Sequence, residues 1–177
     1  CCGLGTGLPG GAGAVTGLQL LPIPGIPEVR PGDDLGALVA DGALASVGLL
    51  DGDVVVVTQK VVSKAENALV AIDPTDPHAH RRLVAGQPRR ILRRRGDLGI
   101  SETHHGHVCA NAGIDVSNVE PGTAALLPED SDRSARRLRD VFVHRYGIAC
   151  GVIVSDTFGR PWRRGVTDVA LGSAGIR

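Results

Sequence analysis

Two apolar runs constrain the fold of this chain most strongly, Val54–Thr58 and Ala149–Val154. Runs of this length that are rich in β-branched residues are typical of strands buried on both faces of a sheet. Each run passes directly into a polar segment, Thr58–Glu66 after the first and Ser155–Gly165 after the second. Because ligands of α/β proteins bind where strands end, both polar segments are candidate parts of a functional site.

The composition narrows the class of protein. A chain of 177 residues can bury a sizeable core as one domain, and aromatic residues make up only 2% of it. The core must therefore consist of Val, Leu, Ile and Ala, which suits an α/β or α+β fold. The 19 basic residues balance the 19 acidic ones. This balance argues against a general nucleic-acid-binding surface, and the few aromatics argue against stacking on single strands.

The cysteines and the N-terminus indicate a compartment. The chain has four cysteines with no CxxC pair, and its start lacks the basic and apolar regions of a secretory signal. No apolar run approaches the length of a membrane span. We therefore expect a cytoplasmic protein without a membrane partner, in which Cys109 and Cys150 are buried thiols.

The N-terminal part reads as a leader followed by a domain. Residues 1–17 are mostly glycine and other small residues, which predicts a flexible leader before a domain at 18–177. The glycines of 3–7 do not form a dinucleotide fingerprint, because no strand precedes them. We expect a first strand at Leu18–Ile23. Prolines at 22, 24 and 27 then predict a rigid, non-helical loop.

Capping residues and apolar spacing locate the helices. Asp33 or Asp34 can cap a helix that begins at Leu35, and Ser131 or Asp132 can cap another that runs to about Arg145. The other expected elements are a turn at Leu49–Asp53, a helix from Asp76 to Val84, strands at Asp97–Thr103 and His107–Ala110 joined at Gly106, a short apolar segment at Thr123–Leu127, and a helix C-cap at Gly147.

The stretch Cys109–Asn118 is dense in small and polar residues and has no hydrophobic period. Gly113 permits a positive φ, Asp115 can hold a hard cation, and Asn118 can bind a hydrogen-bonding edge. The alternative is a polar turn held by Asx hydrogen bonds. Asn111 and Ser117 are expected to shape the loop.

The two strand-end segments carry groups for phosphate and metal. In the first, Lys64 and Ser63 could meet a phosphate, and Glu66 could bind a metal or pair with Lys64; the alternative is an exposed amphipathic turn. In the second, Asp156 and Thr157 can ligate a hard cation. Three arginines there, at 160, 163 and 164, could neutralise a phosphate, and the alternative is a capped surface loop.

Three histidines, at 104, 105 and 107, raise the possibility of zinc. Residues two apart share one face of a strand, so His105 and His107 could point the same way. No third ligand stands at zinc-site spacing, which favours structural or surface histidines.

Asp115 and Asp156 are two candidate oxygen ligands, and magnesium or manganese sites commonly use one or two carboxylates with substrate phosphates. No Walker motif is present. Spacing and composition therefore predict metal-dependent use of a phosphorylated ligand.

Several motifs, in order, then resemble the coenzyme F420-0:L-glutamate ligase family. They are Leu21–Pro27, Pro31–Leu35, Asp51–Val57, Val62–Glu66, Asn111–Val119 and Asp156–Arg160.

This resemblance implies an α+β fold with mixed β-sheets and flanking helices. It implies an enzyme that uses GTP to join L-glutamate to coenzyme F420-0, and further glutamates through γ-linkages, by way of an acyl phosphate with release of GDP and phosphate. It also implies a divalent metal (Mg or Mn), a monovalent cation (K) and a homodimer.

The resemblance also assigns residues by motif position. Those implied to contact GTP are Gly25, Ile26, Pro27, Glu28, Gln59, Lys60, Lys64 and Asn118, and those implied to bind metal are Asp115, Asp156 and, for a second ion, Thr157. The family domain continues past residue 177 with further nucleotide and metal contacts. We therefore expect an incomplete fold and a chain that is inactive or poorly stable alone. The alternative is a non-catalytic nucleotide- or metal-binding fragment or remnant.

Overall fold

A mixed three-stranded sheet, in the order β1-β7-β8, forms the centre of the fold. β1 (Val54–Thr58) pairs in parallel with β7 (Gly151–Gly159), and β8 (Val166–Ala174) pairs antiparallel with β7. The computed structural model describes residues 17–96, 98–159 and 164–176. Residues 1–16 of the expected leader at 1–17 lie outside these ranges, and so do the cysteines at positions 1 and 2.

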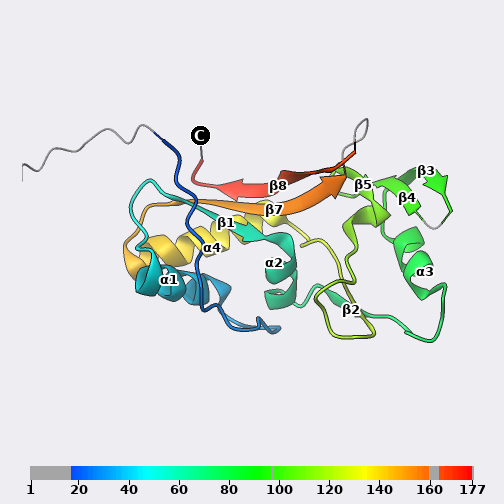
Figure 1. Ribbon diagram of the computed structural model, residues 1–177, viewed down its shortest axis with the longest axis horizontal. Coiled ribbons are helices and arrows are strands. Elements are labelled where there is room, and N and C mark those ends of the chain that lie inside the picture. Colours follow the sequence, from blue (N-terminus) through cyan, green and yellow to red (C-terminus); the bar gives the residue numbers. More distant parts are fainter. Residues whose placement is uncertain (1–16, 97, 160–163, 177) are drawn as a thin grey trace, which may run out of the picture.

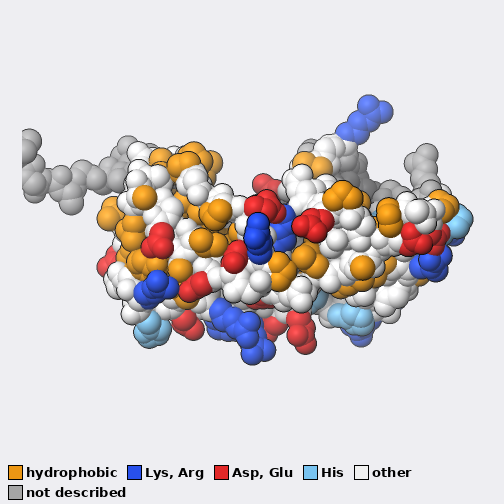
Figure 2. All heavy atoms as spheres, turned by 90° about the horizontal axis from the view of Figure 1, so that it is seen from below, with side chains coloured by type: hydrophobic (Ala, Val, Ile, Leu, Met, Phe, Trp, Pro, Cys, Tyr) orange, Lys and Arg blue, Asp and Glu red, His pale blue; other side chains and the backbone are white. Residues whose placement is uncertain are grey.

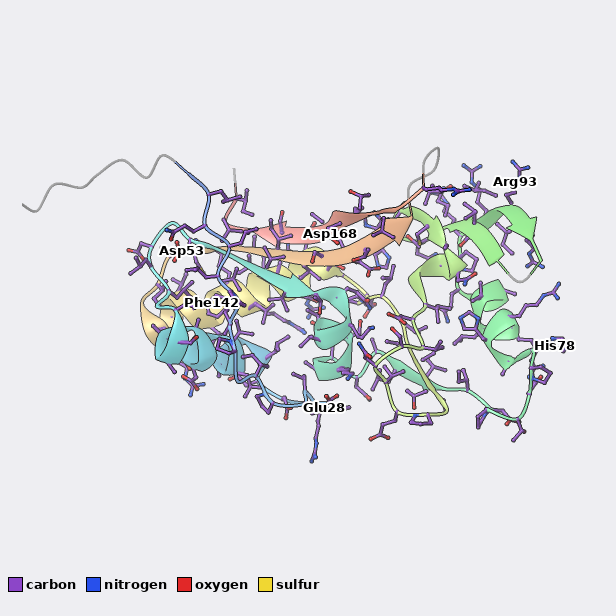
Figure 3. All side chains as sticks on the ribbon, in the orientation of Figure 1. Glu28, Asp53, His78, Arg93, Phe142 and Asp168 are labelled. Carbon is purple, nitrogen blue, oxygen red and sulfur yellow. The ribbon has the colours of Figure 1, made fainter. Side chains whose placement is uncertain are left out.

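Three helices lie on one side of this sheet, α1 (Leu35–Ser46), α2 (Gln59–Ala65) and α4 (Ser131–Tyr146), and no described helix lies on the other side (Figure 1). The hydrophobic core fills the space between the two layers. Phe142 of α4, the largest fully buried side chain among the described residues, lies below the sheet in Figure 3. Most of the other core residues are valine and alanine, with a few leucines such as Leu35, Leu49 and Leu138. The valines and alanines include Val39, Ala40, Ala43, Val55, Val57, Val152 and Val154.

The remaining elements extend the molecule to one side (Figure 1). They are β2 (Leu69–Ala71), α3 (Ala79–Gly86), β3 (Arg90–Arg95), β4 (Leu98–Glu102), β5 (Val108–Ala110), the 3₁₀ turn η1 (Asn111–Gly113) and β6 (Thr123–Ala125). β2 pairs with β6, and β3, β4 and β5 form an antiparallel meander. Mixed sheets with flanking helices confirm the α+β class.

Several local expectations are confirmed. Asp34 caps α1, because its Oδ1 accepts from the backbone N–H of Ala37 at 3.0 Å. Gly147 ends α4 in the left-handed region at φ 70°. Gly106, at φ 85°, turns the chain between β4 and β5. Cys109 and Cys150 are buried free thiols.

The expected strand at Leu18–Ile23 is wrong, because the structure has no strand there. Leu18 and Leu20 are 88% and 85% exposed, and only Ile23 at the end of this stretch packs against the core. The stretch pairs with no described strand. A strand requires a partner for its backbone groups, and the prolines that follow remove donors. Apolar composition alone therefore did not predict the structure of this segment.

The prediction that β1 is buried on both faces is also wrong. Val55 and Val57 are 4% and 6% exposed, whereas Val54 and Val56 are 51% and 59% exposed. Successive side chains of a strand point to opposite faces, and described helices cover only one of them. The valines on the uncovered face make the run continuously apolar, as in a strand buried on both faces, although they are themselves exposed.

Three boundaries differ from expectation. α4 is capped by Asp130, whose Oδ1 accepts from the N–H of Arg133 at 2.8 Å, rather than by Ser131 or Asp132. α3 begins at Ala79 rather than at Asp76, because the Asp76 side chain accepts from the N–H of His78 in a local turn. β7 continues to Gly159, since β8 pairs with it along its length. Asp156 and Thr157 are therefore inside a strand and not in a loop after it.

In the described ranges, every helix is too short or too polar to cross a bilayer.

Gly172 of β8 provides a sharp test of this packing. A Cβ at this position would overlap the backbone of Ser131 and Asp132 at the start of α4, and backbone cannot move aside as a side chain can. We expect Gly172→Ala to lower the free energy of unfolding by about 2 kcal/mol or more, measured by urea denaturation. Gly159→Ala in β7 is the control, because no described atom outside its chain neighbours lies within 4 Å of its Cβ position. Equal effects of the two substitutions would contradict the close contact of β8 with α4.

Candidate active site

Helix α2 organises the candidate site because one of its faces is buried and holds a distant segment, while the other carries two lysines toward carboxylates. Residues four apart share one face of a helix, so Gln59 and Ser63 point to one side while Lys60 and Lys64 point to another. The first pair is fully buried and the second is half-buried. Lys60 and Lys64 are also the only lysines in the sequence, against seventeen arginines.

The inner face of α2 anchors a distant segment. Gln59 Nε2 donates to Ser63 Oγ at 2.7 Å and to the carbonyl of Leu126 at 2.9 Å, and Ser63 Oγ donates to the same carbonyl at 2.6 Å. Gln59 is 1% exposed. The structure thus places the Gln59 side chain amide, an implied GTP contact, in a buried hydrogen-bonded cluster. Ser63, a candidate phosphate ligand, lies there too.

The outer face of α2 meets a carboxylate. Lys60 Nζ lies 2.7 Å from Asp115 Oδ2 and donates to Ser117 Oγ at 2.8 Å. Asp115 Oδ1 accepts from the backbone N–H of Ser117 at 2.7 Å. Burial tends to raise the pKa of Asp115, but the hydrogen bonds from Lys60 and Ser117 outweigh it and hold that pKa below its ordinary value. Ser117 shapes the loop, as expected, and also orients Lys60.

The backbone of Asp115 is held by the segment that α2 anchors. Asp115 and Ala125 exchange two backbone hydrogen bonds of 3.0 and 2.8 Å, and Ala125 is next to Leu126. Just before Asp115, Gly113 adopts φ 71° and lies against Leu127, where a Cβ would not fit. Helix α2 therefore fixes the Asp115 backbone through its inner face and the carboxylate through its outer face.

Asp156 enters the same electrostatic environment from β7. Burial raises the pKa of Asp156, and the negative charge of Asp115 raises it further, while the N–H of Thr157 and the charge of Lys60 act in the opposite direction. Asp156 in turn helps raise the pKa of the buried Cys109 thiol to about 11, after burial as the larger cause. The structure thus brings together Asp115 and Asp156, which we call the site carboxylates, with Lys60 beside them.

Thr157 points the other way. Neighbouring residues of a strand face opposite sides of the sheet, and Thr157 Oγ1 donates to Asp168 Oδ1 on β8 at 2.8 Å. The Thr157 hydroxyl is therefore not gathered with Asp115. Sequence reasoning did not identify Asp168, which also raises the pKa of Asp156. Its role depends on the register of β7 with β8, for which the sequence carries no local signal.

The loop Gly25–Glu28 lies close to the other lysine. Lys64 Nζ donates to Glu28 Oε1 at 2.5 Å, and Glu28 lies below α2 in Figure 3. Ile26 packs against the core and abuts Gly42 of α1, while Gly25 turns the chain at φ 78°. Seen from below in Figure 2, acidic and basic side chains alternate near the middle of this face and do not form a basic patch.

The other sequence candidates have separate places. Asn118 is exposed and left-handed at φ 54°, and Asn111 shapes its loop by accepting from the N–H of Gly99 at 3.1 Å. Glu66 accepts from Ser134 Oγ at 2.7 Å and does not pair with Lys64. Arg164 is exposed, and the arginines at 160 and 163 lie outside the described residues.

The histidines do not assemble a metal site. His105 Nε2 lies 2.7 Å from the carbonyl oxygen of Glu129, and the His107 ring meets Phe158 edge-on at 6.1 Å. In the part of the chain that the structure describes, no three His, Cys, Asp or Glu side chains form a group suited to a metal ion.

The site carboxylates nevertheless fit a hard divalent cation that is shared with a phosphate. Such a site commonly needs only one or two carboxylates, with water and phosphate oxygens completing the shell. The raised pKa of Asp156 reflects burial and repulsion from Asp115, and a cation between the two would relieve that repulsion. Lys60 supplies a positive charge at the same place.

A separate cleft of about 760 Å³ lies between α1, α2 and α4. It does not include Lys60 or the site carboxylates. Its acidic side chains outnumber its arginines, so it is poorly suited to a polyphosphate. The charged residues that line it are Asp33, Asp34, Glu66, Glu129, Asp130, Arg133 and Arg137.

Comparison with known proteins gives a consistent result. The profile of the family described as F420-0:gamma-glutamyl ligase matches residues 25–177. The coenzyme F420:L-glutamate ligase of Methanopyrus kandleri is 42% identical over 93% of this chain and 69% of its own length. The ligases of the same name from Methanothermobacter thermautotrophicus and Halorubrum lacusprofundi are 39% and 38% identical, each over 90% of this chain and over 69% and 67% of their own lengths.

The buried anchor of α2 can be tested by deleting one hydroxyl. Ser63→Ala removes a hydrogen bond to the Leu126 carbonyl and an acceptor for Gln59 in a fully buried position. We expect a loss of about 1–3 kcal/mol in the free energy of unfolding, measured by urea denaturation. Ser46→Ala is the matched control, because Ser46 also donates to a backbone carbonyl from a helix but is exposed, and should cost less than about 0.5 kcal/mol. A loss at Ser63 no larger than at Ser46 would mean that the cluster does not anchor α2.

Proposed function

Because this chain belongs to the F420-0:gamma-glutamyl ligase family, we propose that it is a coenzyme F420:L-glutamate ligase that uses GTP. The observation that carries the proposal is the convergence of Lys60, Asp115 and Asp156 from three separate segments, within a chain 42% identical to a ligase of that name. A lysine near the phosphates and acidic side chains that hold a metal ion recur in phosphoryl-transfer sites that lack a Walker loop.

The proposed reaction activates a carboxylate. A carboxylate is a poor acyl donor, so one of its oxygens first attacks the γ-phosphorus of GTP, and the bond from that phosphorus to the β,γ-bridging oxygen breaks to release GDP. The amine of L-glutamate then attacks the acyl carbon of the acyl phosphate. Phosphate leaves, the nitrogen loses a proton, and an amide remains. Further γ-linked glutamates would be added by the same two steps.

Residues of this chain have proposed roles in positioning the nucleotide. Lys60 and Lys64 would neutralise phosphate oxygens, and the short hydrogen bond from Lys64 to Glu28 would tie the Gly25–Glu28 loop to the same nucleotide. Asn118, exposed on the loop after Asp115, would contact the nucleotide. We assign Gln59 to anchoring α2, since its side chain is buried away from solvent.

The site carboxylates would hold a divalent cation, Mg²⁺ or Mn²⁺. Such an ion neutralises charge on phosphoryl oxygens as the phosphoryl group is transferred. Thr157 and Asp168 supply oxygens on the opposite face of β7 for a second cation, and a K⁺ requirement is part of the same proposal.

We also propose a homodimer, which the exposure of Val54 and Val56 on the uncovered sheet face supports.

The test is glutamate-dependent turnover. The purified protein is given coenzyme F420-0, L-glutamate, GTP and Mn²⁺, and product is followed by mass spectrometry and by phosphate release. We expect Asp156→Asn to lower kcat at least about 100-fold, because removing a metal-binding carboxylate removes stabilisation of the transferred charge. Asp140→Asn, an exposed position on α4, is the control and should retain activity.

The rival hypothesis is a non-catalytic module that binds nucleotide or metal. It would be supported if the protein binds GTP and Mn²⁺ but forms no glutamyl product under these conditions. Equal activity of the wild-type protein and Asp156→Asn would instead remove Asp156 from the metal site.

A further inference from the structure

The contact between Lys60 and Asp115 occupies the position that a cation would need. Of the two oxygens of Asp115, Oδ1 accepts from the backbone of Ser117, and Oδ2 lies 2.7 Å from the ammonium of Lys60. The two side chains are 21% and 37% exposed, so solvent screens this pair less than it screens a surface pair. A metal ion at Oδ2 must therefore first displace an ammonium group.

We propose that Lys60 makes the site carboxylates selective for a divalent cation that arrives with a phosphate group, in preference to the free cation. This inference rests on the proposed function, in which Asp115 and Asp156 hold the metal of a nucleotide. Lys60 then determines what binds, because it blocks one ligand and favours the other.

Two electrostatic costs oppose binding of the free cation. It breaks the ion pair of Lys60 with Asp115, and it leaves the ammonium beside a double positive charge. Asp156, whose pKa responds to both Asp115 and Lys60, would then have to offset the charge of the metal and that of the ammonium together. Lys64 gives no relief, since it is itself positive and is paired with Glu28. Free Mg²⁺ or Mn²⁺ should therefore bind weakly.

A metal bound to phosphate replaces the repulsion between the Lys60 ammonium and the metal with an attraction. Its phosphate oxygens offer Lys60 a new partner of opposite charge when Asp115 passes to the metal. Lys60 keeps its hydrogen bond to Ser117 as a pivot, because the Ser117 hydroxyl is a separate acceptor 2.8 Å away. Metal and phosphate should then bind cooperatively, and by linkage each should tighten the other by the same factor.

The experiment measures metal binding rather than turnover. Isothermal titration with Mn²⁺ is carried out on the full chain, alone and saturated with a non-hydrolysable GTP analogue, with heats corrected for Mn²⁺ held by free nucleotide. We expect the analogue to tighten Mn²⁺ binding to the wild-type protein. Lys60→Met should bind free Mn²⁺ about fivefold more tightly than the wild type, as expected for loss of one competing ion pair, and should show a correspondingly smaller effect of the analogue.

Three further variants sharpen the result. Lys60→Gln repeats the neutralisation with a polar side chain, in case the Met variant fails to fold, and Lys60→Arg should keep the preference for the metal–nucleotide complex. Arg145→Met is the control for net charge. Arg145 also pairs with a carboxylate, that of Asp34 at 3.3 Å, but on α4 and away from the site. It should leave free Mn²⁺ affinity unchanged.

The outcomes separate this inference from the function on which it rests. If the wild-type protein binds no Mn²⁺ even with the analogue, the proposed metal site fails, and the inference fails with it. If the wild type binds Mn²⁺ with the analogue but neither neutral variant tightens free Mn²⁺, the inference alone is overturned. Equal tightening by Arg145→Met would also overturn it, since the effect would then come from net charge.

Discussion

The parallel pairing of β1 with β7 is the constraint on which the rest of the structure depends. Two parallel neighbours cannot be joined by a hairpin, so the chain needs a long crossover, and residues 59–150 supply it. The register then aligns the ends of the two strands, with Thr58 opposite Ser155. At that point β1 stops and turns into α2, while β7 continues past it. Lys60 and Asp156 are brought to the same place for this reason, although 96 positions separate them.

Helix α2, at the beginning of the crossover, also determines the position of Asp115, the third residue of the site. Helix α2 has only seven residues, and both its buried face and its lysine-bearing face make side-chain contacts with other segments. Its buried face binds the Leu126 carbonyl, and the adjacent Ala125 pairs with the backbone of Asp115. A short helix contributes little stability by itself. Its buried hydrogen bonds therefore matter more than its helical propensity, and a disturbance of the anchor would displace Asp115 from Lys60 without any change at the site.

Sequence reasoning succeeded where the relevant physics is local. The caps at Asp34 and Gly147 depend on a few neighbouring residues, and both were predictable. It failed where partners decide the outcome. The stretch Leu18–Ile23 has an apolar composition but pairs with no described strand, and Val54 and Val56 face a side of the sheet that no described helix covers.

The same division holds for the site. The site carboxylates were identified as chemically apt residues, but Asp156 was expected in a loop because the continuation of β7 depends on β8. The role of Asp168 depends on the same pairing. Gln59 was expected to contact GTP, and the distant Leu126 carbonyl, which the sequence does not indicate, holds its buried side chain. The pairing of Lys60 with Asp115 was equally beyond local reasoning, since 54 residues lie between them in sequence.

The charge arrangement of the site explains why no basic patch marks it. Both lysines of the chain are on α2, and each is already paired with a carboxylate, Lys60 with Asp115 and Lys64 with Glu28. A site with free lysines would attract any polyanion and would gain association rate at the expense of selectivity. Under the proposed function, the pair of Lys60 with Asp115 instead requires an incoming ligand to offer a phosphate to the ammonium and a cation to the carboxylate. A metal–nucleotide complex does both, whereas a nucleic-acid backbone or a free phosphate would leave the released carboxylate uncompensated.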